Sequence, residues 1–199
     1  MIKNPLFLAL TFFNFCSSSQ VLASYGFADV TTSTGSVDPT PVPLAIGITF
    51  SPFSAVGTSS NPSASGRFSF TGWPVGAQDM NDAVSSMTSA IDMNRYYNVD
   101  IIPVTGYSVT LNAISFFMRR SGTGIRNYSV RSSADGYTAN LPASVGTNTK
   151  LSVVSPDVFF WNYDAAPNSS DQRGNVISLS GAAFTNFTKD RHLFRPIPD

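Results

Sequence analysis

Short apolar runs alternate with turn residues along most of the chain after Arg67, and they predict β-strands. The runs recur roughly every 8 to 15 residues, and none repeats its apolar positions with a helical period over a useful length. In "YYNVDIIPV" (96–104), Tyr97, Val99 and Ile101 share one face. About eight to ten such strands predict an all-β fold: an antiparallel, jelly-roll-like β-sandwich with few or no helices.

The phase of the alternation changes once between residues 107 and 118. Apolar residues stand at odd positions in "GYSVTLN", so we expect Tyr107, Val109 and Leu111 to point into the core. From residue 114 to 118 the apolar positions are even. A slip of one residue predicts a bulge or a tight bend near 112–113.

Four of the nine arginines lie within "FFMRRSGTGIRNYSVRSSADGY" (116–137). If 114–120 and 127–133 pair as a hairpin, Arg119 and Arg131 share its outer face and Arg126 stands at the edge of its loop.

Two interpretations of these arginines stay open. They can pair with aspartates such as Asp135 and keep an ordinary exterior soluble. Alternatively, they can form a cationic face that binds carboxylate or sulfate groups of a polysaccharide through bidentate hydrogen bonds.

The first 23 residues have the layout of a secretory signal peptide. Lys3 precedes an apolar run of 11 residues, which is too short to span a bilayer, and Val21 and Ala23 suit signal peptidase. A rival is lipoprotein processing at Cys16. We therefore expect a protein that is secreted or held at the cell surface, with a flexible lead over 24–43 and one domain over 44–199.

Composition narrows the chemistry of the mature chain. Loss of Cys16 leaves no thiol, which excludes a cysteine nucleophile and a zinc–thiolate site. Loss of Lys3 leaves 11 basic residues against 12 acidic ones, a net charge of −1. This balance does not indicate the basic surface that nucleic-acid binding requires. No second apolar run is long enough to be a transmembrane segment.

The sequence offers little for catalysis. A Ser-His-Asp triad would need His192, the only histidine, which the pattern places in an irregular C-terminal tail. A glycosidase would need two facing carboxylates, and none of the 12 aspartates stands in a recognisable context. We predict a protein that is not an enzyme, with an aspartate-dependent glycoside hydrolase as the remote alternative.

Loop residues supply the remaining candidates. In 161–175 the side chains of Asp164, Asn168 and Asp171 are of the type that binds calcium, although turn formation explains them equally well. No other cofactor is indicated. Aromatic rings in loops can stack on sugars, and the candidates are Trp73, Tyr137 and Tyr163.

The stretch "YYNVDIIPVTGYSVTLNAISFFMRRSGTGIRNYSVRSSADGYTANL" resembles a module of secreted bacterial proteins that carry PEP-CTERM or gliding-associated sorting tails. The resemblance covers roughly residues 50–188 and is most specific at "RRSGTGIRNYSVRSSADGY". It implies an exported β-sandwich, and it brings no functional residues with it.

The end of the chain departs from that module. Its members continue past "FTNFT" with further strands, whereas this sequence ends in "KDRHLFRPIPD". A domain truncated at its C-terminus would leave an open sheet edge, through which copies could associate.

Three functions follow as hypotheses. The first is a secreted, non-catalytic module that binds polysaccharide or a cell-surface glycan through Trp73, Arg119, Arg126, Arg131, Tyr137 and Tyr163. The second is a structural or adhesive protein of the envelope or matrix. The third is the aspartate-dependent hydrolase.

Overall fold

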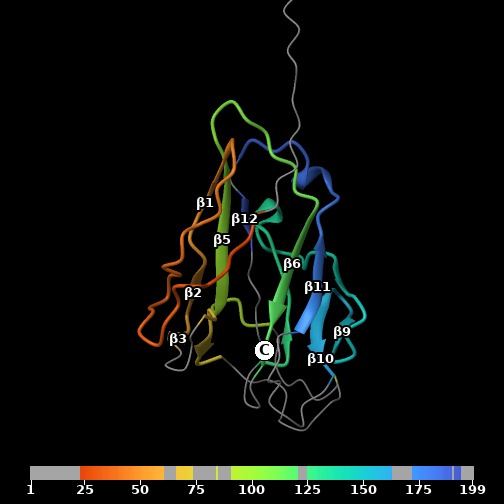
Figure 1. The fold of residues 1–199 in the computed structure, drawn as a ribbon. Helices are drawn as coiled ribbons and strands as arrows, with labels where there is room; N and C mark the ends of the chain where they lie inside the picture. The colour runs from red at the N-terminus through yellow and green to blue at the C-terminus, as the bar shows by residue number, and fades with distance from the viewer. Residues whose placement is uncertain are drawn as a thin grey trace, which may run out of the picture.

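The protein is built almost entirely from short antiparallel strands (Figure 1). The computed structural model describes residues 23–60, 66–73, 84, 91–120, 125–162, 172–189 and 191–193. Among these residues no helix reaches seven residues, and the sheets stack as a sandwich that is not closed. The predicted all-β class is thereby confirmed. Two short 3-10 helices are η2 (Ser133–Asp135) and η3 (Ala182–Phe184).

Strand β5 (Tyr96–Pro103) is the centre of one sheet. Strand β12 (Arg191–Leu193) pairs with one of its edges, and β1 (Ile48–Phe50) and β2 (Ser54–Val56) pair in succession along the other. Three residues, 51–53, separate β1 from β2, opposite only two residues of β5. The extra residue is a bulge, and Pro52 within it has no N–H to continue the ladder.

Two three-stranded sheets stand beside the β5 sheet, toward the right of Figure 1. In one sheet β11 (Gln172–Ser178) lies between β6 (Ala113–Met118) and β8 (Ala143–Val145). In another, β10 (Val158–Trp161) lies between β7 (Asn127–Tyr128) and β9 (Leu151–Val154). A two-stranded ribbon joins β3 (Ser59–Ser60) to β4 (Phe70–Thr71).

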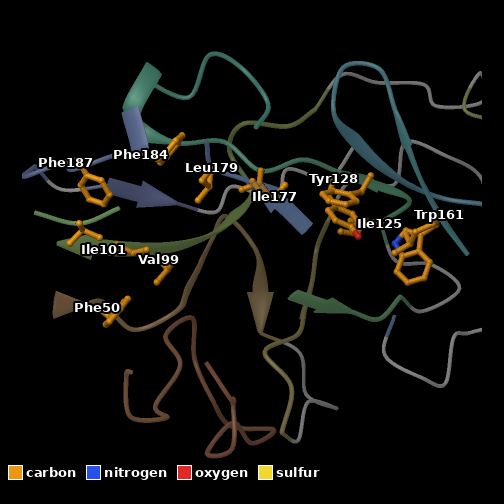
Figure 2. Packing of buried hydrophobic residues seen from close by; sticks show 14 residues of the cluster. Phe50, Val99, Ile101, Ile125, Tyr128, Trp161, Ile177, Leu179, Phe184 and Phe187 are labelled. Atoms are coloured by element: carbon orange, nitrogen blue, oxygen red, sulfur yellow. The ribbon is translucent and has the colours of Figure 1, made fainter. Parts of the chain in front are cut away.

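One apolar cluster joins these sheets (Figure 2). Val99 and Ile101 of β5 lie in this cluster together with Ile177 of β11 and with Leu179, which directly follows β11. Tyr128 stacks on Phe159 with ring centroids 4.9 Å apart. The buried members of the cluster are Phe50, Val99, Ile101, Val109, Ile125, Tyr128, Val130, Leu151, Phe159, Trp161, Ile177, Leu179, Phe184 and Phe187.

The predicted alternation is confirmed in β5 and β6. In β5, Val99 and Ile101 are buried, while Asn98 and Asp100 between and beside them are partly exposed. In β6, exposed residues alternate with half-buried ones. The half-buried residues stand at even positions, as the phase change predicts. The pairing of β6 with β11 has a register shift in β11, between Gln172 and Asn175. The bulge or tight bend near 112–113 stays a prediction.

The prediction for residues 107–111 is wrong at one position. Val109 is buried and Leu111 is half-buried, but Tyr107 is 50% exposed. Tyr107 belongs to a turn, in which its N–H donates to the Val104 carbonyl at 2.9 Å. The segment forms a single bridge, between Val109 and Phe187, so a strand-like alternation does not hold at its first residue.

The predicted hairpin between 114–120 and 127–133 is also wrong. Strand β6 pairs with β11, and the strand after the arginines, β7, pairs with β10. Alternation specifies which face of a strand is buried but carries little information about which strand lies beside it.

Residues 24–43, predicted as a flexible lead, have few regular elements but contact the domain. The Tyr25 hydroxyl donates to the Ser51 carbonyl at 2.8 Å. The Asp38 N–H donates to the Phe53 carbonyl, and Val30 is buried. The segment therefore packs along β1 and β2. The signal-peptide prediction concerns residues that, apart from Ala23, lie outside the described part of the chain.

Candidate functional site

The arginines of 116–137 do not form the exposed face that the sequence suggested. Arg126 is 1% exposed, and Arg120 is buried as well. One Arg126 guanidinium nitrogen donates to the Trp161 carbonyl at 3.0 Å, and the group lies 5.0 Å from the centre of the Phe160 ring. Because this charge is enclosed by protein, Arg126 serves the packing around β10.

Arg131 is half-buried and bound within the domain. Its Nε donates to Asn140 Oδ1 at 2.8 Å, and its Nη1 donates to the Tyr137 carbonyl at 3.0 Å. The expected pairing with Asp135 is not formed, because Asp135 accepts hydrogen bonds from the turn that follows it. Tyr137 has a positive φ of 64° and a half-buried side chain.

Trp73 is half-buried and packs against Tyr97. Its indole N–H donates to the Phe70 carbonyl at 2.9 Å, and its ring lies edge-on to Tyr97 with centroids 5.2 Å apart. None of these contacts is shared with Arg126 or Arg131. Arg119 is half-buried and directly follows β6.

The remaining predicted residues, Tyr163, Asp164, Asn168 and Asp171, lie outside the described residues, so calcium binding stays a prediction.

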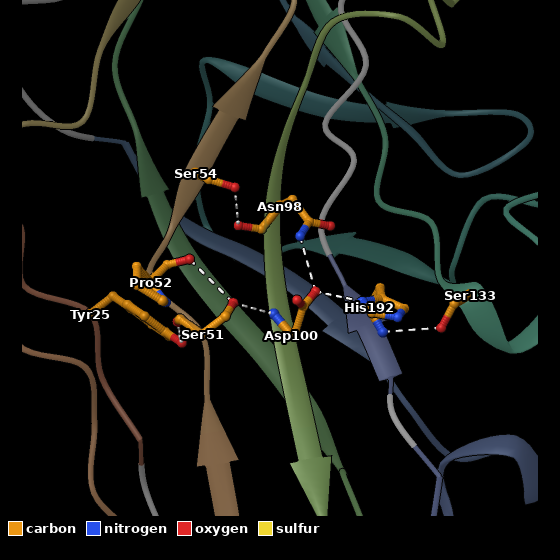
Figure 3. A network of polar contacts seen from close by, with 8 residues as sticks. All are labelled: Tyr25, Ser51, Pro52, Ser54, Asn98, Asp100, Ser133 and His192. Carbon is orange, nitrogen blue, oxygen red and sulfur yellow. Dashed lines mark hydrogen bonds and ion pairs between the residues drawn. The ribbon is translucent and has the colours of Figure 1, made fainter. Parts of the chain in front are cut away.

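A different set of polar residues meets on the outer face of the β5 sheet (Figure 3). His192 Nδ1 lies 2.6 Å from Asp100 Oδ1, and the Asn98 amide donates to the same oxygen at 2.9 Å. The Asp100 N–H donates to Ser51 Oγ at 2.8 Å, and the His192 N–H donates to Ser133 Oγ at 3.0 Å. We call Asn98, Asp100 and His192 the polar triplet.

Three elements far apart in sequence place the polar triplet. Asn98 and Asp100 are two residues apart in β5, so they share the face opposite Val99 and Ile101. Strand β12 brings in His192, directly opposite Asp100 in the ladder. The bulge between β1 and β2 turns the Ser51 hydroxyl toward the β5 backbone.

Each member of the triplet has one side-chain polar atom held by a hydrogen bond and another that no described group bonds. Asp100 Oδ1 holds both neighbours, and no described group bonds its Oδ2. No described group bonds Asn98 Oδ1 or His192 Nε2 either. The His192 side chain is 42% exposed and that of Asp100 is 24% exposed. The triplet thus presents oriented polar atoms without first having to order its side chains.

The side chains of the triplet are of the types that bind a ligand by hydrogen bonds and that transfer protons. An ionised carboxylate only accepts hydrogen bonds, so Nδ1 is the donor to Asp100 when Asp100 is ionised. That leaves Nε2 as an acceptor when the imidazole is neutral. Within the described residues no hydroxyl bonds Nε2, and a nucleophile in that position is what triad catalysis requires. Nε2 of a neutral His192 can accept a hydrogen bond from a ligand hydroxyl.

Tyr25 borders the triplet through Ser51. Loss of water around its hydroxyl raises the pKa of Tyr25 above its ordinary value, and the negative charges of Asp100 and Asp38 add to the effect. Tyr25 therefore stays neutral at physiological pH and keeps its bond to the Ser51 carbonyl.

Sequence reasoning missed the triplet. Alternation in "YYNVDIIPV" put Asn98 and Asp100 on the polar face of a strand, which was the available signal. His192 was assigned to an irregular tail, and that assignment is wrong because the residue lies in β12. Its contact with Asp100 spans 92 positions of the chain.

The described residues contain no cluster of three or more His, Cys, Asp or Glu side chains suited to a metal ion. They also contain no helix of the length and apolarity that a membrane crossing needs. No family model matches the chain, and neither a curated protein nor a solved structure matches it. The resemblance to secreted bacterial modules stays a prediction.

Proposed function

We propose that this protein is an exported, non-catalytic module that binds a glycan through the polar triplet on the outer face of β5. The observation that carries the proposal is the set of side chains fixed by hydrogen bonds, each partly exposed and with a second polar atom that no described group bonds. Because these side chains are already ordered, binding of a ligand costs little side-chain conformational entropy.

The chemistry of the triplet suits hydroxyl groups. Asp100 Oδ2 and Asn98 Oδ1 accept hydrogen bonds, and His192 Nε2 accepts or donates according to its protonation. One carboxylate beside one imidazole has no large excess of either sign, so an anionic ligand gains little. A polyhydroxylated, uncharged ligand can both donate to and accept from these groups.

The geometry of the strand suits a sugar ring. Residues i and i+2 of a strand lie about 7 Å apart, so Asn98 and Asp100 can bond hydroxyls at two positions of one ring. Tyr96 and Ile102 continue the same face of β5, and both are partly exposed. Their apolar surface flanks the polar groups, as carbohydrate sites require.

Asp100→Asn tests the proposal. It keeps the shape of the side chain and removes the charge that strengthens bonds from sugar hydroxyls, so we expect the affinity for the best glycan on an array to fall about tenfold or more. Titration calorimetry on that glycan measures the change. Thermal unfolding of the variant separates lost binding from lost folding.

Asp29→Asn is the matched control, because Asp29 is exposed and the substitution makes the same change of charge. We expect its affinity to equal that of the parent. If both variants bind alike, or if no glycan binds the parent, the triplet is not a glycan site. Release of new sugar ends during incubation would instead favour the hydrolase. Six of its candidate aspartates lie outside the described residues: Asp79, Asp82, Asp164, Asp171, Asp190 and Asp199.

A further inference from the structure

Two neighbouring turns at one end of the sandwich expose large apolar side chains to solvent. The turn before β1 carries Leu44, which is 93% exposed, and Ile46, which is 85% exposed. The turn after β5 carries Val104 and Tyr107, of which Tyr107 is 50% exposed. We call these four residues the apolar tip. In Figure 1 the two turns stand together at the upper end of the β5 sheet.

The fold holds the two turns against each other. Ile48 pairs with Pro103, and the Val104 N–H donates to the Gly47 carbonyl at 2.9 Å. Gly47 has a positive φ of 77°, and a Cβ there would lie 2.3 Å from the Tyr107 ring. The ring therefore rests on the glycine backbone. The tip is a fixed surface whose apolar groups have not packed inward.

The surroundings of the tip carry almost no charge. No Asp, Lys, Arg or His occurs within 39–66 or within 101–118, the two segments that form the turns. The Val109–Phe187 bridge brings a third segment to the same end, and Thr188 lines a hollow together with Tyr107. The next residue, Lys189, is exposed. Among the described residues of 39–66, 101–118 and 187–189, Lys189 is the one charged side chain, next in the chain to Thr188. Exposed apolar side chains together with a nearby cation are complementary to a lipid surface that is apolar inside and anionic outside.

We propose that the apolar tip docks the protein onto a lipid bilayer. Leu44 and Ile46 enter the boundary between headgroups and acyl chains, Tyr107 lies at the depth of the headgroups, and Lys189 faces anionic lipid. Aromatic side chains with a polar end favour that depth, and single cations gain from anionic headgroups. None of the four tip residues belongs to the polar triplet, so the proposal does not depend on glycan binding.

A bilayer fits this surface better than a second copy of the chain. A stable protein interface uses about 800 Å² and 20–30 residues on each side, and the tip offers four side chains on two turns. A protruding turn also needs a matching hollow in a protein partner, whereas lipid adapts to it. Shallow insertion by a few aliphatic side chains is enough for reversible membrane binding.

The test uses the protein recovered after export, sedimented with vesicles of phosphatidylcholine alone or of equimolar phosphatidylcholine and phosphatidylglycerol. We expect binding to both, and tighter binding to the anionic vesicles. Leu44→Ser with Ile46→Ser should weaken partitioning at least about tenfold, because two apolar groups are lost from the lipid contact. Lys189→Gln should weaken binding to the anionic vesicles alone, by about fivefold.

Phe117→Ser is the matched control, since Phe117 is 60% exposed on β6 and its loss removes apolar surface elsewhere. It should bind vesicles as the parent does. Tyr107→Trp reports insertion locally, because its emission should shift to the blue with vesicles, relative to the background of Trp73 and Trp161.

Three results would overturn the proposal. The first is a parent protein that binds neither vesicle. The second is equal binding by the Leu44/Ile46 variant and the Phe117 variant. The third is a parent dimer, seen by light scattering, that the Leu44/Ile46 variant converts to monomer, since this would assign the tip to self-association.

Discussion

Arg126→Ala is expected to lower the free energy of unfolding by about 3–5 kcal/mol. The Arg126 side chain is among the largest that are fully buried, so its removal leaves a cavity beside Phe160. The Trp161 carbonyl also loses the donor that the guanidinium supplies. Urea denaturation monitored by tryptophan fluorescence measures the change.

One further variant separates the effect of the cavity from that of the lost hydrogen bond, and a second serves as a control. Arg126→Met keeps most of the volume and removes the hydrogen bond, so we expect a smaller loss of about 1–3 kcal/mol. Arg67→Ala shortens an exposed arginine and should change stability by no more than about 0.5 kcal/mol. If Arg126→Ala were as stable as Arg67→Ala, the guanidinium would not be buried against β10.

Stability is expected to fall steeply as the pH rises above about 10. Burial raises the pKa of Tyr128 well above its ordinary value, and burial raises the pKa of Tyr97 as well. Above pH 10 the unfolded chain loses these protons while the folded protein keeps them. The contribution of these tyrosines to the free energy of unfolding is therefore fully present below pH 10. Above pH 10 it falls by about 1.4 kcal/mol per pH unit for each such tyrosine.

Tyr128→Phe checks the assignment. At pH 7 the variant should be about 1–2 kcal/mol less stable, because the Tyr128 hydroxyl donates to Asn175 Oδ1 at 2.6 Å. Above pH 10 its stability should fall less steeply than that of the parent, by about 1.4 kcal/mol per pH unit. Denaturation curves between pH 7 and 11.5 give both quantities. An unchanged alkaline slope would mean that Tyr128 ionises in the folded protein.

Period-two alternation was sufficient to predict the inward face of β5 and of β6. In β5 it placed Val99 and Ile101 inside and left Asn98 and Asp100 outside. It located the change of phase before β6 as well. These features follow from the geometry of a single strand, in which successive side chains point to opposite faces, so no knowledge of the partner strand is required.

The sequence by itself thus determined the all-β class and the inward face of the main strands. Only the tertiary structure decided that β6 pairs with β11, that Arg126 is enclosed beside Trp161, and that His192 meets Asp100. Contacts of this kind join positions far apart in the chain. A local pattern of apolar and polar residues is compatible with many such pairings, and packing of the whole domain selects among them.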